Sequence, residues 1–247
     1  MNTVHVNILR KVDCADMLKS TSHYLKKSMM FYDLRSRNLP VVIFLLLFIT
    51  NVIYLLFNID IYTFNNLSIV DIVILMGYLL TTEIISFMYQ LGSIKDIRGE
   101  EYSVGQCVSE LFSRIFFYLI ALIAKMIIIF SGIVILIVPG VIVFLMFYFV
   151  ETLVVDQKMS IVKAFKASYE VTKGKKIRLF SIEVFCMVTV FLLGSMVVML
   201  FSSFSYYVYL YVNAFISAIM SLINTKRIAH LYTDIFCAAE EQAEALT

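Results

Sequence analysis

The stretch Ile133–Phe147, IVILIVPGVIVFLMF, places Pro139 and Gly140 in the middle of unbroken apolar sequence. The pair either kinks one long helix or turns the chain back on itself. Residues 115 to 155 number 41 and are mostly apolar. As one continuous helix they would extend about 60 Å, roughly twice the hydrocarbon thickness of a bilayer. Length therefore favours a hairpin over a kink.

Pro139 and Gly140 also have the chemistry of a tight turn. Proline presets φ near −65° and glycine accepts a positive φ, which suits the two central positions of a type II turn. We therefore predict that Pro139 and Gly140 form the turn between two membrane spans. A proline kink within one helix is the alternative.

Composition places the chain among membrane proteins. Of its 247 residues, 61% are hydrophobic and only 15% are charged, against about 25% charged in soluble domains. Several apolar runs approach the roughly 20 residues that a helix needs to cross a bilayer, and they lack the alternation of barrel strands. The sequence predicts an all-α, polytopic integral membrane protein.

Six apolar runs are expected to cross the membrane, with both termini in the cytoplasm. With six crossings, nineteen of the twenty Lys and Arg residues lie on one side, Lys125 being the exception. This agrees with the enrichment of basic residues in cytoplasmic loops, whereas five spans would leave the seven basic residues of 158–178 outside. The predicted spans are about 39–58, 67–91, 115–138, 140–156, 179–201 and 206–225.

The cytoplasmic parts have amphipathic patterns of their own. Residues 1–38 form an amphipathic N-terminal segment, 103–112 and 160–173 are predicted amphipathic helices, and 226–247 is a cytoplasmic tail. Ser160 at the start and Gly174 just after the end are residues typical of helix termini, which supports a helix over 160–173. Two interpretations are therefore open. The chain consists of three repeats, each a cytoplasmic helix followed by a membrane hairpin, or it is a six-span protein with ordinary amphipathic connections.

Glu83 and Lys125 are the most deeply placed charges of the predicted spans, at similar distances from the cytoplasmic side. Ionisable residues at such depth usually face the bundle interior or water, and they are functional candidates by default. Two interpretations stay open: a structural ion pair between the second and third spans, or groups along a ligand or ion pathway. Acidic residues nearer the span ends are expected at the interface: Asp71, Glu151, Asp156 and Glu183.

Basic residues beside the fourth and fifth spans are expected to contact anionic lipid head groups or a partner at the inner face. Protein partners would be a second copy of the chain or another membrane protein, and no nucleic acid is expected. The chain shows no familiar catalytic motif and no metal-ligand spacing among its cysteines and histidines, so we expect no catalytic residue, metal or cofactor. The head-group set is Lys163, Lys166, Lys173, Lys175, Lys176 and Arg178.

Residues 137–180 resemble the membrane domain of some bacterial glycerophosphoryl diester phosphodiesterases and of related multi-pass membrane proteins. The likeness lies in the Pro139–Gly140 pair, in an apolar span that ends at Asp156, and in the helix KAFKASYEVTKGK with its Ser168 and Gly174. In that family the phosphodiesterase chemistry belongs to a separate soluble domain, which we do not find in this sequence. The resemblance implies a membrane unit, bacterial in origin, in the cytoplasmic membrane.

Three functions follow as hypotheses. The first is a non-enzymatic membrane protein that acts as an accessory, immunity-type or export- or envelope-associated component through contacts in the membrane. The second is a small transporter or channel that uses Glu83 and Lys125. The third is an intramembrane enzyme acting on lipids.

Overall fold

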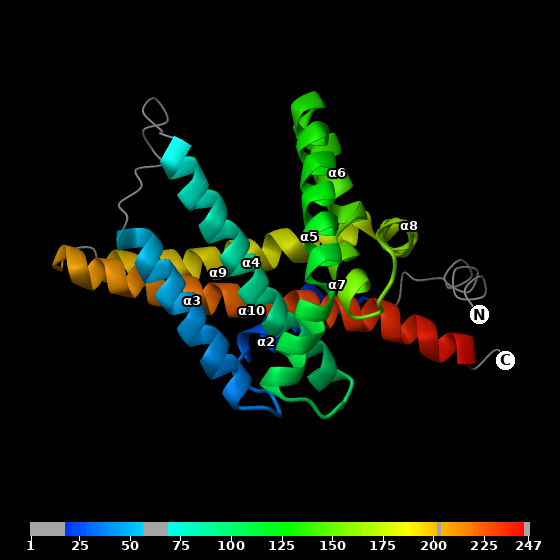
Figure 1. Cartoon of the computed structure of the whole chain (residues 1–247), viewed down its shortest axis with the longest axis horizontal. Coiled ribbons are helices and arrows are strands. Elements are labelled where there is room, and N and C mark those ends of the chain that lie inside the picture. The colour runs from blue at the N-terminus through cyan, green and yellow to red at the C-terminus, as the bar shows by residue number, and fades with distance from the viewer. Residues whose placement is uncertain (1–17, 57–68, 202–203, 245–247) are drawn as a thin grey trace.

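The computed structural model of the chain describes residues 18–56, 69–201 and 204–244, in which every regular element is an α-helix (Figure 1). Six stretches are long and apolar enough to cross a membrane, as expected for a multi-pass membrane protein: α3, α4, most of α5, α6 with α7, α9, and α10 as far as Phe236. The helices are α2 (Thr21–Met29), α3 (Asn38–Leu56), α4 (Ile69–Ile97), α5 (Val104–Ile135), α6 (Ile137–Met146), α7 (Val150–Val155), α8 (Ile161–Thr172), α9 (Lys176–Phe201) and α10 (Tyr206–Glu244).

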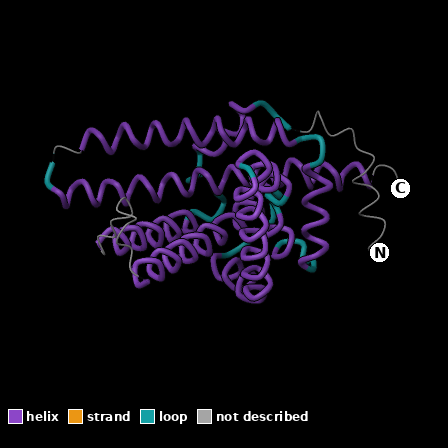
Figure 2. Tube along the Cα trace, turned by 90° about the horizontal axis from the view of Figure 1, so that it is seen from above, coloured by secondary structure: helices purple, strands orange, loops and turns teal. Residues whose placement is uncertain are grey.

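The long helices pair in chain order into three hairpins, α3–α4, α5–α6 and α9–α10. The hairpins point in different directions from a shared base, which contains α2 and α7 (Figure 1). The view from above also shows long helices running in pairs (Figure 2). Helix α10 packs along both α3 and α4, which joins the first and third hairpins, whereas α5 has a smaller contact with α4.

Helix α10 does not end at the predicted boundary, residue 225. It has 39 residues and continues through Lys226 and Arg227 to Glu244. The two basic side chains are buried, with 5% and 1% of their surface exposed, and Leu231 and Ile235 continue the buried face. This apolar face packs into the base, so residues 226–236 are part of the helical core and not a separate tail.

Of the two predicted amphipathic helices, 160–173 forms a separate helix and 103–112 does not. Residues 103–112 are not a separate helix, because no Gly or Pro interrupts the sequence from Cys107 to Ser131 and α5 runs unbroken through it. Its start is a capping box, in which the Ser103 hydroxyl accepts from Gln106 N at 3.2 Å and the Gln106 side chain accepts from Ser103 N at 2.8 Å. Helix α8 matches the predicted 160–173 segment closely, and it buries small residues such as Ala164 and Ala167.

Helix α2 docks on α10 through polar contacts. The Tyr24 hydroxyl donates to Asp234 Oδ2 at 2.9 Å, and Lys19 Nζ lies 3.0 Å from Asp234 Oδ1. Burial of the phenol and the neighbouring Asp234 carboxylate raise the pKa of Tyr24 well above its ordinary value. The described part of the predicted 1–38 segment is therefore packed into the protein, and residues 1–17 lie outside the described residues.

The chain reverses at Leu136, three residues before Pro139. Leu136 has extended dihedral angles (φ −162°, ψ 146°) and separates α5 from α6, which pack together as a hairpin and not as a kinked helix. Pro139 and Gly140 lie in the first turn of α6, so the predicted type II turn at these two residues is wrong. The missing N–H of Pro139 has no helical partner to lose at this position.

Glycine is nevertheless required at this hairpin, because the two helices meet backbone to backbone. A Cβ atom on Gly132 would lie 2.9 Å from Gly140 Cα, and one on Gly140 would lie 2.8 Å from Ile133 N. Close approach through small residues is a usual way for helices to associate in membranes, where lipid tails are as apolar as the side chains.

We predict that Gly140→Ala lowers the stability of the protein by about 1–3 kcal/mol, because the added methyl group forces the α5 and α6 backbones apart. Thermal unfolding of the purified protein in detergent measures the effect. Gly77→Ala is the matched control, because Gly77 lies inside α4 with nothing within 4 Å of the added Cβ. Equal melting temperatures for the two variants would contradict the close contact.

Candidate functional site

A cleft of about 620 Å³ opens beside α5, with Glu83 of α4 and Phe144 of α6 completing its lining. Its walls are apolar apart from Glu83, Lys125 and Ser131, and Phe130 is 69% exposed along it. The structure therefore brings the two predicted deep charges to one cleft. The remaining lining residues are Leu122, Met126, Ile127, Ile129 and Ile133.

Lys125 forms its ion pair with Glu151 of α7 and not with Glu83. The Lys125 Nζ to Glu151 Oε1 distance is 2.5 Å, and the two side chains are only 15% and 8% exposed. Glu83 is an electrostatic neighbour of both. Sequence reasoning had placed Glu151 at the interface, but the irregular residues 147–149 between α6 and α7 precede a helix that is buried throughout.

Glu83 is left with one negative charge to be balanced. It is exposed at the cleft and forms no salt bridge with any side chain in the described part of the chain. With Lys125 and Glu151 neutralising each other, the three groups sum to −1 when Glu83 is ionised. A charge in the centre of a membrane helix costs at least about 2.5–3.5 kcal/mol, so Glu83 favours contact with water or with a cationic group.

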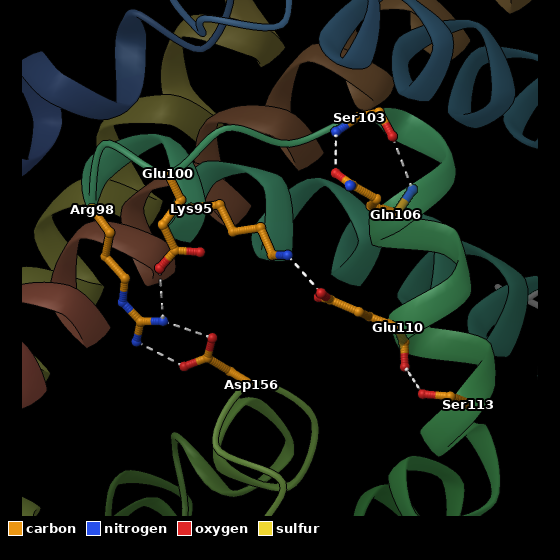
Figure 3. Close-up of polar contacts among 8 residues, drawn as sticks. All are labelled: Lys95, Arg98, Glu100, Ser103, Gln106, Glu110, Ser113 and Asp156. Carbon is orange, nitrogen blue, oxygen red and sulfur yellow. Dashed lines mark hydrogen bonds and ion pairs between the residues drawn. The ribbon is translucent and has the colours of Figure 1, made fainter.

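Three further ion pairs join elements of the base, and the first is centred on Asp156. Arg98 donates to both oxygens of Asp156 at 2.9 and 2.8 Å, and the two side chains face each other in Figure 3. The Tyr232 hydroxyl donates to Asp156 Oδ2 at 2.6 Å. One carboxylate after α7 thus joins the end of α4 to α10, and such two-point Arg–carboxylate pairs also fix orientation.

The second pair connects α9 with α10. Arg227 donates to Glu183 Oε1 at 2.5 Å, and the Tyr148 hydroxyl donates to Glu183 Oε2 at 2.6 Å. Glu183 and Asp156, both predicted to lie near the membrane interface, accept hydrogen bonds from side chains distant in the sequence. No local sequence pattern points to these partners, because they lie more than 30 residues away along the chain.

Helices α4 and α5 are also joined at the base, where Lys95 Nζ lies 2.6 Å from Glu110 Oε1 (Figure 3). This pair lies near the start of α5, far along the helix from Lys125. Its carboxylate is partly exposed, and surface pairs of this kind contribute at most about 1 kcal/mol. It orients the two helices more than it stabilises them.

The six basic residues predicted to contact lipid head groups differ in how far they are buried. Lys163, Lys166 and Lys173 are exposed, whereas Lys175 is 5% exposed and does not present its charge at the surface. Lys175 follows Gly174 (φ +82°) in the tight connection from α8 to α9, which turns it inward. Lys176 Nζ lies 5.7 Å from the Tyr169 ring centroid, and Arg178 donates to the Leu18 carbonyl.

Comparison of the chain with protein-family models, with curated proteins and with solved structures finds no match. The resemblance of residues 137–180 to a phosphodiesterase membrane domain stays a prediction. Among the described residues, no group of three or more His, Cys, Asp and Glu side chains is placed to hold a metal ion.

We predict that Lys125→Met destabilises the protein by about 3–5 kcal/mol, because it leaves Glu151 buried without a partner. The double variant Lys125→Met, Glu151→Gln is expected to recover most of this loss. Thermal unfolding in detergent measures both variants, with Lys163→Met as the control for removal of an exposed lysine. A double variant no more stable than Lys125→Met would contradict the pairing.

Proposed function

We propose that this is a non-enzymatic multi-pass protein of the cytoplasmic membrane that acts by binding a ligand or partner in the cleft beside α5. Such a protein would serve as an accessory, immunity-type or export- or envelope-associated component. The observation that carries the proposal is Glu83, a carboxylate without an ion-pair partner among the described residues, at an apolar cleft inside candidate membrane spans.

The form of the cleft supports binding from within the membrane. Its open side is bordered by exposed apolar side chains of α5, including Ile127 and Phe130. A ligand that partitions into lipid would reach such a cleft by lateral diffusion. Pockets that hold small ligands are mostly apolar with a few polar groups that fix orientation, as here.

The proposed topology has both termini in the cytoplasm, and the α5–α6 turn faces outside. It is supported by the positions of nineteen of the twenty basic residues. We predict that a cysteine at Leu136 reacts with an impermeant maleimide added to intact cells, whereas a cysteine at Lys173 reacts only after lysis. Both positions are exposed in the folded chain. Labelling of Lys173→Cys in intact cells would overturn the topology.

We predict that a photoreactive benzoyl-phenylalanine in place of Phe130 captures a discrete ligand in cells. The same group in place of Phe191, which is exposed on α9, is expected to capture phospholipid alone. Intact mass measurement of the two purified proteins compares the adducts. Identical adducts at the two positions would show that the cleft holds only bulk lipid and would refute the proposed function.

A small transporter or channel is the second candidate, and the ionisable groups at the cleft favour it. The two functions differ in whether a bound solute crosses the bilayer. Movement of the ligand identified at position 130, supplied as the free compound, across the membrane of proteoliposomes would select the transporter.

A further inference from the structure

We propose that the cleft binds an amphiphile with a single cationic group, whose charged end pairs with Glu83 and whose apolar part lies along α5. This inference rests on the proposed function and names the chemical class of its ligand.

The charges of the site set the sign and the number of charges on the ligand. Lys125 and Glu151 lie 2.5 Å apart and neutralise each other, so Glu83 supplies one negative charge that the described side chains do not balance. An anionic ligand would be repelled by Glu83 and would meet a lysine that already has a partner. A second cationic group would lie near Lys125 without a carboxylate of its own.

The walls indicate the rest of the ligand. Met126, Phe130 and Phe144 border the cleft. Methionine is adaptable and polarisable, and aromatic rings attract cations as well as apolar groups. The volume of about 620 Å³ lies in the range of roughly 300–1,000 Å³ that is usual for small-molecule sites. It exceeds what a single metal ion needs.

A bare metal ion also lacks ligands here. Hard divalent cations take six or more oxygen atoms. Apart from the Glu83 carboxylate, the side chains that line the cleft provide one oxygen, the Ser131 hydroxyl, which donates to the Ile127 carbonyl at 2.8 Å. An organic cation needs one carboxylate and an apolar wall, and both are present.

Equilibrium binding of tetraphenylphosphonium to the full chain tests the inference. The protein is reconstituted in nanodiscs of phosphatidylcholine, which has no net charge to attract the probe. Tetraphenylborate is the control ligand, since it has the same shape and the opposite charge. After the uptake of each ion by empty nanodiscs of the same lipid is subtracted, we expect the phosphonium ion to bind at least tenfold more tightly than the borate.

Three single substitutions test whether phosphonium binding depends on the Glu83 carboxylate. Glu83→Gln is expected to weaken phosphonium binding at least tenfold, and Glu83→Asp to retain it within about threefold. Glu101→Gln is the matched control, because it removes an exposed carboxylate outside the cleft and should change binding less than twofold. Thermal unfolding of each variant shows whether it is folded.

Two results would overturn the inference: equal phosphonium binding by folded Glu83→Gln and the unsubstituted protein, or borate binding as tight as phosphonium binding. A discrete adduct at position 130 together with either result would mean that the cleft holds a ligand of another class. Loss of both the adduct and the Glu83-dependent binding would instead remove the proposed function itself.

Discussion

Charges that leave water need partners of opposite sign, and this requirement organises the base of the structure. One stretch of chain, from α7 to the first half of α9, supplies three carboxylates, each of which receives a cation from a different helix. Glu151 pairs with Lys125 of α5, Asp156 with Arg98 after α4, and Glu183 with Arg227 of α10. Arg98 and Lys125 thus join the first and second hairpins to this stretch. The Glu183–Arg227 pair lies within the third hairpin, which the Tyr232–Asp156 hydrogen bond connects to the same stretch.

These ion pairs contribute more to the choice of one helix arrangement over others than to the free energy of unfolding. A buried ion pair often gains no more than an apolar replacement would, yet removal of one partner is strongly unfavourable. Any packing that separated the first or the second hairpin from α7 and Asp156 would leave a buried charge alone. Farther from the base, Ser86 bonds to Ser221 at 2.9 Å, and the Asn51 side chain donates to the Ala214 carbonyl at 3.4 Å. These contacts join the first and third hairpins along their length.

The α5–α6 hairpin is held differently, which explains why the cleft lies beside it. Its Gly132–Gly140 contact is internal to the hairpin, and its ion pairs, Lys95–Glu110 and Lys125–Glu151, lie on the side toward the base. Lipid tails give apolar helices no hydrophobic drive to associate. With fewer polar contacts to its neighbours, this hairpin diverges from α4 and leaves the Glu83 face of α4 open.

Hydropathy was sufficient to predict the helical class and six apolar stretches, because crossing a bilayer demands about 20 apolar residues whatever the tertiary contacts. It did not locate the reversal at Leu136, because a single extended residue carries no signature beside a Pro–Gly pair. Nor did it place Arg227 inside the base. The positive-inside rule reports the side of the membrane and says nothing about burial.

The sequence left two interpretations of Glu83 and Lys125 open, a structural ion pair or groups along a ligand or ion pathway, and the two residues now differ in this respect. Lys125 has a structural explanation, since its pair with Glu151 satisfies both charges at 2.5 Å. Glu83 has no structural explanation among the described residues, because Lys125, which could have balanced its charge, pairs with Glu151 instead. A structural role for Glu83 would require a compensating group, and the groups that line the cleft with it are apolar, apart from Lys125 and a serine hydroxyl already engaged with its own helix. The functional interpretation therefore rests on Glu83 alone, with Lys125 and Glu151 as the pair that keeps its charge uncompensated.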